Sequence, residues 1–197
     1  MKRKSDFYDS FILPNNLTHL DFSIIKVFCE LLIKKPIEQI TVKELCSKSF
    51  ISRGTFYNYF SSVYDVQETL INFIIENIMY QQKGFLYSTI KPDIIHNANP
   101  LMINSFNFVK HTQLEHRALW GDYGPNLFKQ KATDLIKGNI YGKILYDGKI
   151  DCDHLYVANF ITNGFIACQN QWINDGCNKS TEDIVLLISK LCFGNFY

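Results

Sequence analysis

Several features that would place a chain in a specialised class are missing from these 197 residues. No apolar run approaches the roughly 18 residues that a membrane-spanning helix needs, and no apolar stretch follows the basic residues Lys2, Arg3 and Lys4. We therefore expect no signal peptide, no membrane segment and a cytoplasmic location. The net charge is only +1, so the protein as a whole does not attract polyanions.

The six cysteines include no C-x-x-C pair, the spacing that zinc sites and redox motifs commonly use. In a reducing cytosol an even number of cysteines does not imply disulfides, so we interpret them as small buried hydrophobic residues. His111 and His116 are five residues apart and would face different directions on one helix. No metal site and no cofactor are predicted.

Catalytic motifs are also missing. There is no glycine-rich phosphate loop, the cysteines and histidines are scattered, and the paired acidic residues stand at helix starts, where capping explains them. We therefore predict that the chain is not an enzyme. An all-helical enzyme is the weakest alternative, and turnover of a metabolite would revive it.

Apolar residues recur at helical spacing along most of the chain, and no strand-like alternation is convincing. The predicted fold is all-α. Pro36 ends the first helix, Gly176 caps the last but one, and Ser180 starts the last. The expected helices cover about residues 20–32, 41–48, 53–60, 64–83, 101–119, 126–146 and 154–175, and the last begins at 180.

A helix-turn-helix is predicted near the N-terminus. Thr41 and Glu44 have the spacing of a capping box, in which each side chain bonds to the backbone N–H of the other residue. Ser52 can cap the third helix after a tight turn. In this motif the third helix enters the DNA major groove, and the second helix crosses the backbone.

The third helix has two chemically different faces. Phe56 and Phe60 are four residues apart and are expected to pack inward. The other face has side chains that suit phosphate oxygens and base edges, and Gly54 allows close backbone approach. These side chains are Arg53, Thr55, Tyr57, Asn58 and Tyr59.

The run from Thr41 to Cys46, followed by Ile51-Ser52-Arg53-Gly54-Thr55-Phe56-Tyr57-Asn58-Tyr59-Phe60, resembles the N-terminal domain of TetR-family transcriptional regulators. The resemblance covers roughly residues 18–66. It implies a DNA-binding domain at 1–66 and a helical ligand-binding and dimerisation domain at 67–197. It also implies that Thr41 contacts phosphate, and that six further residues face DNA: Ser52, Arg53, Gly54, Thr55, Tyr57 and Tyr59.

Two positions depart from the family pattern. The family usually has glycine in the turn before the third helix, where this chain has Phe50. Either the turn differs, or Phe50 adopts a backbone conformation that is strained for a residue other than glycine. The family also usually has a phosphate-contacting lysine at the start of the fourth helix, where this chain has Val63.

The resemblance further implies a homodimer through the last two helices and a small-molecule pocket among the middle ones. The expected function is a repressor that leaves a double-stranded DNA operator when an inducer binds. A regulator or co-activator of the same fold, controlled by a protein partner, is the alternative. The pocket candidates are Tyr80, Phe106, His111, Trp120, Tyr123 and Phe160, although aromatic residues at helical spacing also build ordinary cores.

Overall fold

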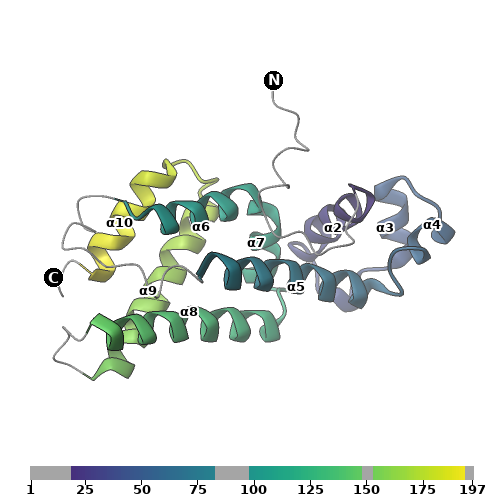
Figure 1. Ribbon diagram of the computed structural model, residues 1–197. Coiled ribbons are helices and arrows are strands. Elements are labelled where there is room, and N and C mark those ends of the chain that lie inside the picture. The colour runs from purple at the N-terminus through teal and green to yellow at the C-terminus, as the bar shows by residue number, and fades with distance from the viewer. Residues whose placement is uncertain (1–18, 83–97, 148–152, 194–197) are drawn as a thin grey trace. The chain divides into compact units, whose positions relative to one another are not determined.

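Every element that the structure describes is helical. The computed structural model describes residues 19–82, 98–147 and 153–193 (Figure 1). In chain order the elements are α2 (His19–Leu32), the 3-10 helix η1 (Ile37–Gln39), α3 (Val42–Ser49), α4 (Arg53–Tyr57), α5 (Val63–Gln82), α6 (Pro100–His111), α7 (Gln113–Trp120), α8 (Asn126–Asp147), α9 (His154–Asn174) and α10 (Thr181–Phe193). The prediction of an all-α fold is confirmed over these residues.

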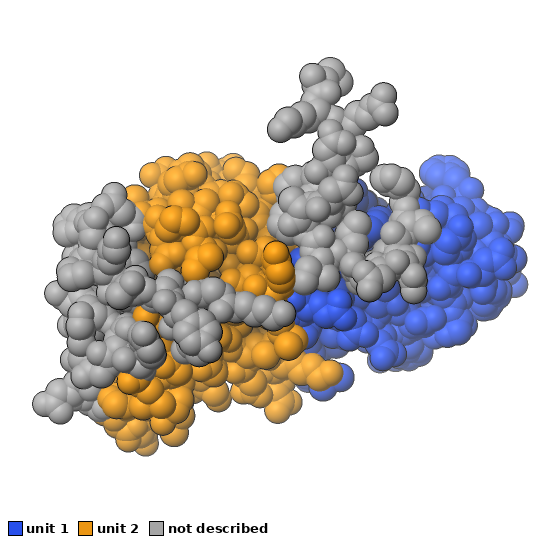
Figure 2. All heavy atoms as spheres, in the orientation of Figure 1, with its two compact units in different colours: residues 1–77, 114–129 blue, residues 78–113, 130–197 orange. Residues whose placement is uncertain are grey.

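The chain divides into two compact units (Figure 2). The first contains residues 1–77 and 114–129, and the second contains residues 78–113 and 130–197. These units reflect packing density, whereas the division predicted at residue 66 separates two functions. That functional division stays a prediction. None of the described helices is both long enough and apolar enough to cross a membrane.

The first unit is built around aromatic and aliphatic side chains of α2, α3 and α4. Helix α2 packs against α3, and α3 packs against α4. Phe22 of α2 meets Phe73 of α5 edge to face, with ring centroids 5.7 Å apart. Helix α2 ends at Leu32, and Pro36 forms the N-cap of η1, so the predicted stop before Pro36 is confirmed.

The third helix is shorter than predicted. Helix α4 ends at Tyr57 instead of residue 60, because the N–H groups of Tyr59 and Phe60 both bond to the carbonyl of Phe56. This tightening ends the regular ladder of hydrogen bonds. It still leaves Phe60 buried beside Phe56, so the inward packing of both rings is confirmed.

The single helix predicted at 101–119 is in fact two helices, α6 and α7, separated at Thr112. The backbone of Thr112 lies outside the helical region, at φ −105° and ψ 33°. Its hydroxyl donates to the carbonyl of Phe108 at 2.7 Å, and its N–H bonds to the same oxygen at 2.9 Å. The break therefore lies in the backbone angles of Thr112, while its hydroxyl bonds to a carbonyl of the last turn of α6.

The core of the second unit lies between α6, α8, α9 and α10. Phe106 of α6 contacts Phe165 and Trp172 of α9, each with ring centroids 5.5 Å apart. Gly176 has a φ of +76° and ends α9, because its N–H bonds to Ile173 and the next N–H bonds to Trp172. The predicted glycine cap is therefore confirmed.

The predicted start of the last helix is also confirmed. The Ser180 hydroxyl accepts the N–H of Asp183 at 3.1 Å, as an N-cap does. The same hydroxyl donates to the Asp183 carboxylate at 2.7 Å. The side chains of Ser180 and Asp183 therefore fix the point where α10 begins.

Candidate DNA-binding interface

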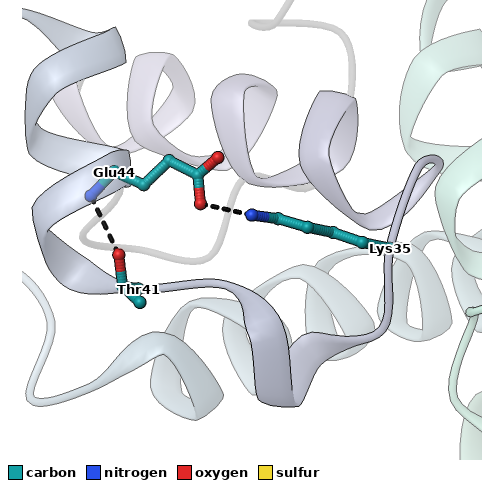
Figure 3. Close-up of polar contacts among 3 residues, drawn as sticks. All are labelled: Lys35, Thr41 and Glu44. Carbon is teal, nitrogen blue, oxygen red and sulfur yellow. Dashed lines mark hydrogen bonds and ion pairs between the residues drawn. The ribbon is translucent and has the colours of Figure 1, made fainter.

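Thr41 caps α3 as predicted. Its hydroxyl accepts the N–H of Glu44 at 3.2 Å, which satisfies one of the N–H groups left open at a helix start. The second half of the predicted capping box is wrong, because the Glu44 carboxylate pairs with the Lys35 ammonium at 2.5 Å (Figure 3). Both side chains of this pair are partly exposed, so the pair contributes little to the stability of the fold.

The turn between α3 and α4 keeps the shape that usually requires glycine. Phe50 adopts the left-handed conformation, with φ 56° and ψ 40°. Its N–H bonds to the carbonyl of Cys46, and the N–H of Ile51 bonds to the same oxygen at 3.0 Å. Of the two expected outcomes, the structure therefore shows the strained one, in which the turn is unchanged and Phe50 adopts it. The Phe50 side chain is 95% exposed.

Ser52 fixes the start of α4. Its hydroxyl accepts the N–H of Thr55 at 3.0 Å and lies 2.8 Å from the Thr55 hydroxyl. The cap requires an extended backbone at Ser52, with ψ 159°, so the chain turns sharply between the two helices. The predicted cap is confirmed, and it positions the first turn of α4.

The two faces of α4 separate as the sequence indicates. Phe56 is completely buried, and its ring centroid lies 6.0 Å from that of Phe60. Thr55 is half-buried, and seven of the eight predicted DNA-contacting residues are exposed. The exposed residues are Thr41, Ser52, Arg53, Gly54, Tyr57, Asn58 and Tyr59.

Exposed charge on this motif is mainly positive. Lys43 and Lys48 of α3 are exposed, as is Arg53 of α4. The carboxylate of Glu44 is neutralised by Lys35. The sequence reasoning left out Lys43 and Lys48, although their place on the helix that crosses the DNA backbone was a usable signal.

The start of α5 has no cation at the position of the missing lysine. Val63 is buried in the core of the first unit. The Asp65 carboxylate accepts both the N–H and the hydroxyl of Ser61, at 2.7 and 3.0 Å. The Ser62 hydroxyl accepts the N–H of Asp65 at 3.1 Å. Local side chains thus cap this helix start, and a phosphate contact here would need a neutral donor.

Comparison with known proteins identifies the family. Residues 96–194, which are 99 of the 197, match the family model TetR_C_8, described as the transcriptional regulator C-terminal region. The chain belongs to the TetR family of transcriptional regulators. No curated protein matches the chain.

Solved structures of TetR-type regulators share this fold. A TetR-family transcriptional regulator from Bordetella parapertussis 12822 gives a TM-score of 0.68 at 13% identity, over 89% of this chain and 95% of that one. SmeT, the repressor of a Stenotrophomonas maltophilia multidrug efflux pump, solved with triclosan, gives 0.66 at 10% identity, over 90% and 91%. The fatty acid degradation regulator FadR from Bacillus halodurans gives 0.63 at 16% identity, over 91% and 97%. Because the sequence identities are low, these structural similarities establish the fold and nothing further.

The six candidates for a TetR-type ligand pocket lie in different surroundings. Trp120 and Tyr123 belong to the first unit, and Trp120 packs edge to face against Phe128 at 5.3 Å. Phe106 is buried in the core of the second unit. The other three candidates of the second unit, Tyr80, His111 and Phe160, are exposed. The ligand site stays a prediction.

The described cysteines behave as packing residues. Cys29, Cys46, Cys177 and Cys192 are buried, and Cys168 is half-buried. Cys152 lies outside the described residues. Burial raises the pKa of the Cys29 thiol well above its usual value and that of Cys192 to about 11, so both stay neutral at pH 7. A neutral buried thiol is a poor nucleophile and a poor metal ligand.

His111 and His116 lie in two different helices. His111 is exposed at the end of α6, where its Nδ1 lies 2.6 Å from the carbonyl of Asn107. His116 is buried in α7. No group of three potential metal ligands occurs among the residues that the structure describes.

Proposed function

We propose that the protein is a DNA-binding regulator that recognises an operator through α3 and α4. One observation carries the proposal: α4 and the turn that follows it bury Phe56 completely and expose Arg53, Tyr57, Asn58 and Tyr59. Guanidinium, amide and phenol groups are donors for phosphate oxygens and base edges. We assign Thr41, Ser52, Gly54 and Thr55 to the same interface, together with the exposed cations Lys43 and Lys48.

We further propose that the protein acts as a homodimer through α9 and α10. These two helices pack against each other. Along α9, Tyr156, Phe160 and Ala167 are exposed on one stripe, and a Cβ added at Gly164 would meet nothing within 4 Å. Leu187 and Leu191 expose apolar surface on α10. A two-fold pair would bury this surface and match a two-fold operator.

Repression relieved by a small molecule is the regulation we propose. This proposal is supported by polar side chains that are buried in the otherwise apolar core of the second unit. Lys143 and Gln169 are buried, and the buried Thr162 hydroxyl lacks a hydrogen-bond partner among the described residues. A ligand would supply such a partner. A related fold has been solved with a small molecule, SmeT with triclosan.

Control by a protein partner is the second candidate function. The exposed apolar side chains of α9 support it as well, because a patch of this kind marks an interaction surface. The association state shows whether this patch is a homodimer interface or a docking site for another protein. A homodimer covers the patch itself, whereas a monomer at micromolar concentration leaves it for another protein.

The decisive experiment is a gel shift with DNA flanking the protein's own coding region, titrated in salt. We expect a discrete complex whose affinity falls steeply as salt rises, because phosphate contacts release counterions. Substituting Lys43 and Lys48 by Gln should reduce the slope of log affinity against log salt by about 2 per subunit. Absence of a complex with folded, dimeric protein on flanking DNA and on a random duplex library would overturn the proposal.

A further inference from the structure

Phe50 combines two unfavourable features at one position. Its backbone is left-handed, a conformation that residues with a Cβ rarely adopt. Its ring is 95% exposed, so packing within its own fold does not offset the strain. Glycine at this position would avoid both costs. A ring that gains almost nothing in the free protein calls for a partner outside it.

The position of Phe50 identifies that partner. It lies two residues before Ser52, the N-cap of α4, and three before Arg53. Three residues of chain span at most about 11 Å, which is close to the 12 Å width of the B-DNA major groove. The N-terminal residues of a recognition helix contact base edges. With α4 in the groove, the Phe50 ring therefore lies within reach of its edge.

The chemistry of the Phe50 side chain indicates which group of the DNA it can contact. A phenyl ring has no hydrogen-bond donor, so it cannot bind phosphate as Arg53 can. The one apolar group that base pairs display in the major groove is the C5-methyl of thymine. We propose that Phe50 is a specificity-determining residue that reads a thymine methyl in each half of the operator. This inference rests on the proposed DNA-binding function.

The test compares thymine with deoxyuridine, which lacks only the methyl group. A duplex is first selected from a random library by the full-length protein, and each symmetry-related pair of thymines is then replaced by deoxyuridine. We expect one pair whose replacement weakens wild-type binding about tenfold, as two lost methyl contacts imply. Phe50→Gly should bind the thymine duplex about tenfold more weakly than wild type and should not discriminate the two duplexes.

Two measurements separate the contact from the fold. Phe50→Gly should unfold at a higher temperature than wild type, because glycine relieves the strained turn. A gain in stability accompanied by a loss of binding has no explanation in a merely structural role. Met79→Ala removes another exposed apolar side chain, in α5, and should bind both duplexes as wild type does.

Each contrary result has its own meaning. If Phe50→Gly binds and discriminates as wild type does, the inference is wrong while the DNA-binding function stands, and the ring serves a protein partner. If the variant weakens equally on both duplexes, the ring or the turn acts without reading the methyl group, which also overturns the inference. If the folded wild-type protein selects no duplex, the proposed function fails, and the inference fails with it.

Discussion

At the scale of single residues, the strained backbone of Phe50 gives the most direct prediction about the free energy of unfolding. The left-handed conformation costs a non-glycine residue about 1 kcal/mol. We predict that Phe50→Gly raises the free energy of unfolding by about 1 kcal/mol, measured by urea denaturation. Phe50→Ala is the matched control, since it removes the ring but keeps the Cβ. An equal gain in both variants would mean that the exposed ring, and not the backbone, carries the cost.

Glu115 provides a second residue-scale prediction. It is buried in α7, and burial raises the pKa of its carboxyl from the usual 4.5, with a backbone hydrogen bond and Lys26 opposing the shift. Because the folded pKa lies above the unfolded one, the native state binds the proton more tightly. The stability contributed by the neutral form is therefore present below pH 4.5 and is lost as the pH rises through the raised pKa.

The corresponding variant is Glu115→Gln. We expect it to raise the free energy of unfolding at pH 7 by on the order of 1 kcal/mol and to flatten this part of the pH profile. Glu76→Gln, at an exposed position of α5, is the matched control. Unfolding by urea at several pH values measures both. A profile of Glu115→Gln identical to wild type would show that the carboxyl is ionised without penalty.

At the scale of elements, the division of α4 into two faces makes opposite predictions for adjacent aromatic residues. Tyr57→Ala should weaken operator binding while the thermal transition stays cooperative, since the ring is more than half exposed. Phe56→Ala should cost about 3 kcal/mol of stability, because it empties a fully buried position. Anisotropy with labelled operator and thermal unfolding measure the pair. Loss of the cooperative transition in Tyr57→Ala would contradict the assignment of faces.

The helices show which parts of the fold are readable from sequence. The caps at Thr41, Ser52 and Ser180 were predictable, because each involves a side chain and an N–H three residues away. Exposure of seven of the eight predicted DNA-contacting residues was predictable for the same local reason, from the spacing of Phe56 and Phe60. These features depend on a few neighbouring residues and little on tertiary context.

Other features depend on alternatives that are close in energy. A threonine in a helical stretch can keep the helical backbone or leave it, and the backbone of Thr112 leaves it at the end of α6. The path of the turn at Phe50 is likewise set by the packing of α3 and α4, and the sequence left both outcomes open. The six pocket candidates stay a prediction, because helical spacing does not say which aromatic residues share one core or line one pocket.

At the scale of the whole molecule, the operator recognition that we propose implies two copies, because a single recognition helix binds weakly and a two-fold site needs a two-fold protein. Phe160 lies near the middle of the exposed stripe on α9 and is 68% exposed. A carboxylate there would face its symmetry mate in a dimer. Burying two like charges would cost several kcal/mol, while the isolated subunit would keep the charge in water.

We therefore predict that Phe160→Glu converts a dimer into a folded monomer. Analytical ultracentrifugation at micromolar concentration should show the change in mass, and circular dichroism should show unchanged helix content. Tyr80→Glu, an equally drastic change at another exposed ring of the second unit, should stay dimeric. Operator affinity should fall with the dimer, because each half-site would then be bound singly. A Phe160→Glu protein that remains dimeric would place the subunit interface elsewhere, and a monomeric wild type would favour a protein partner on this surface.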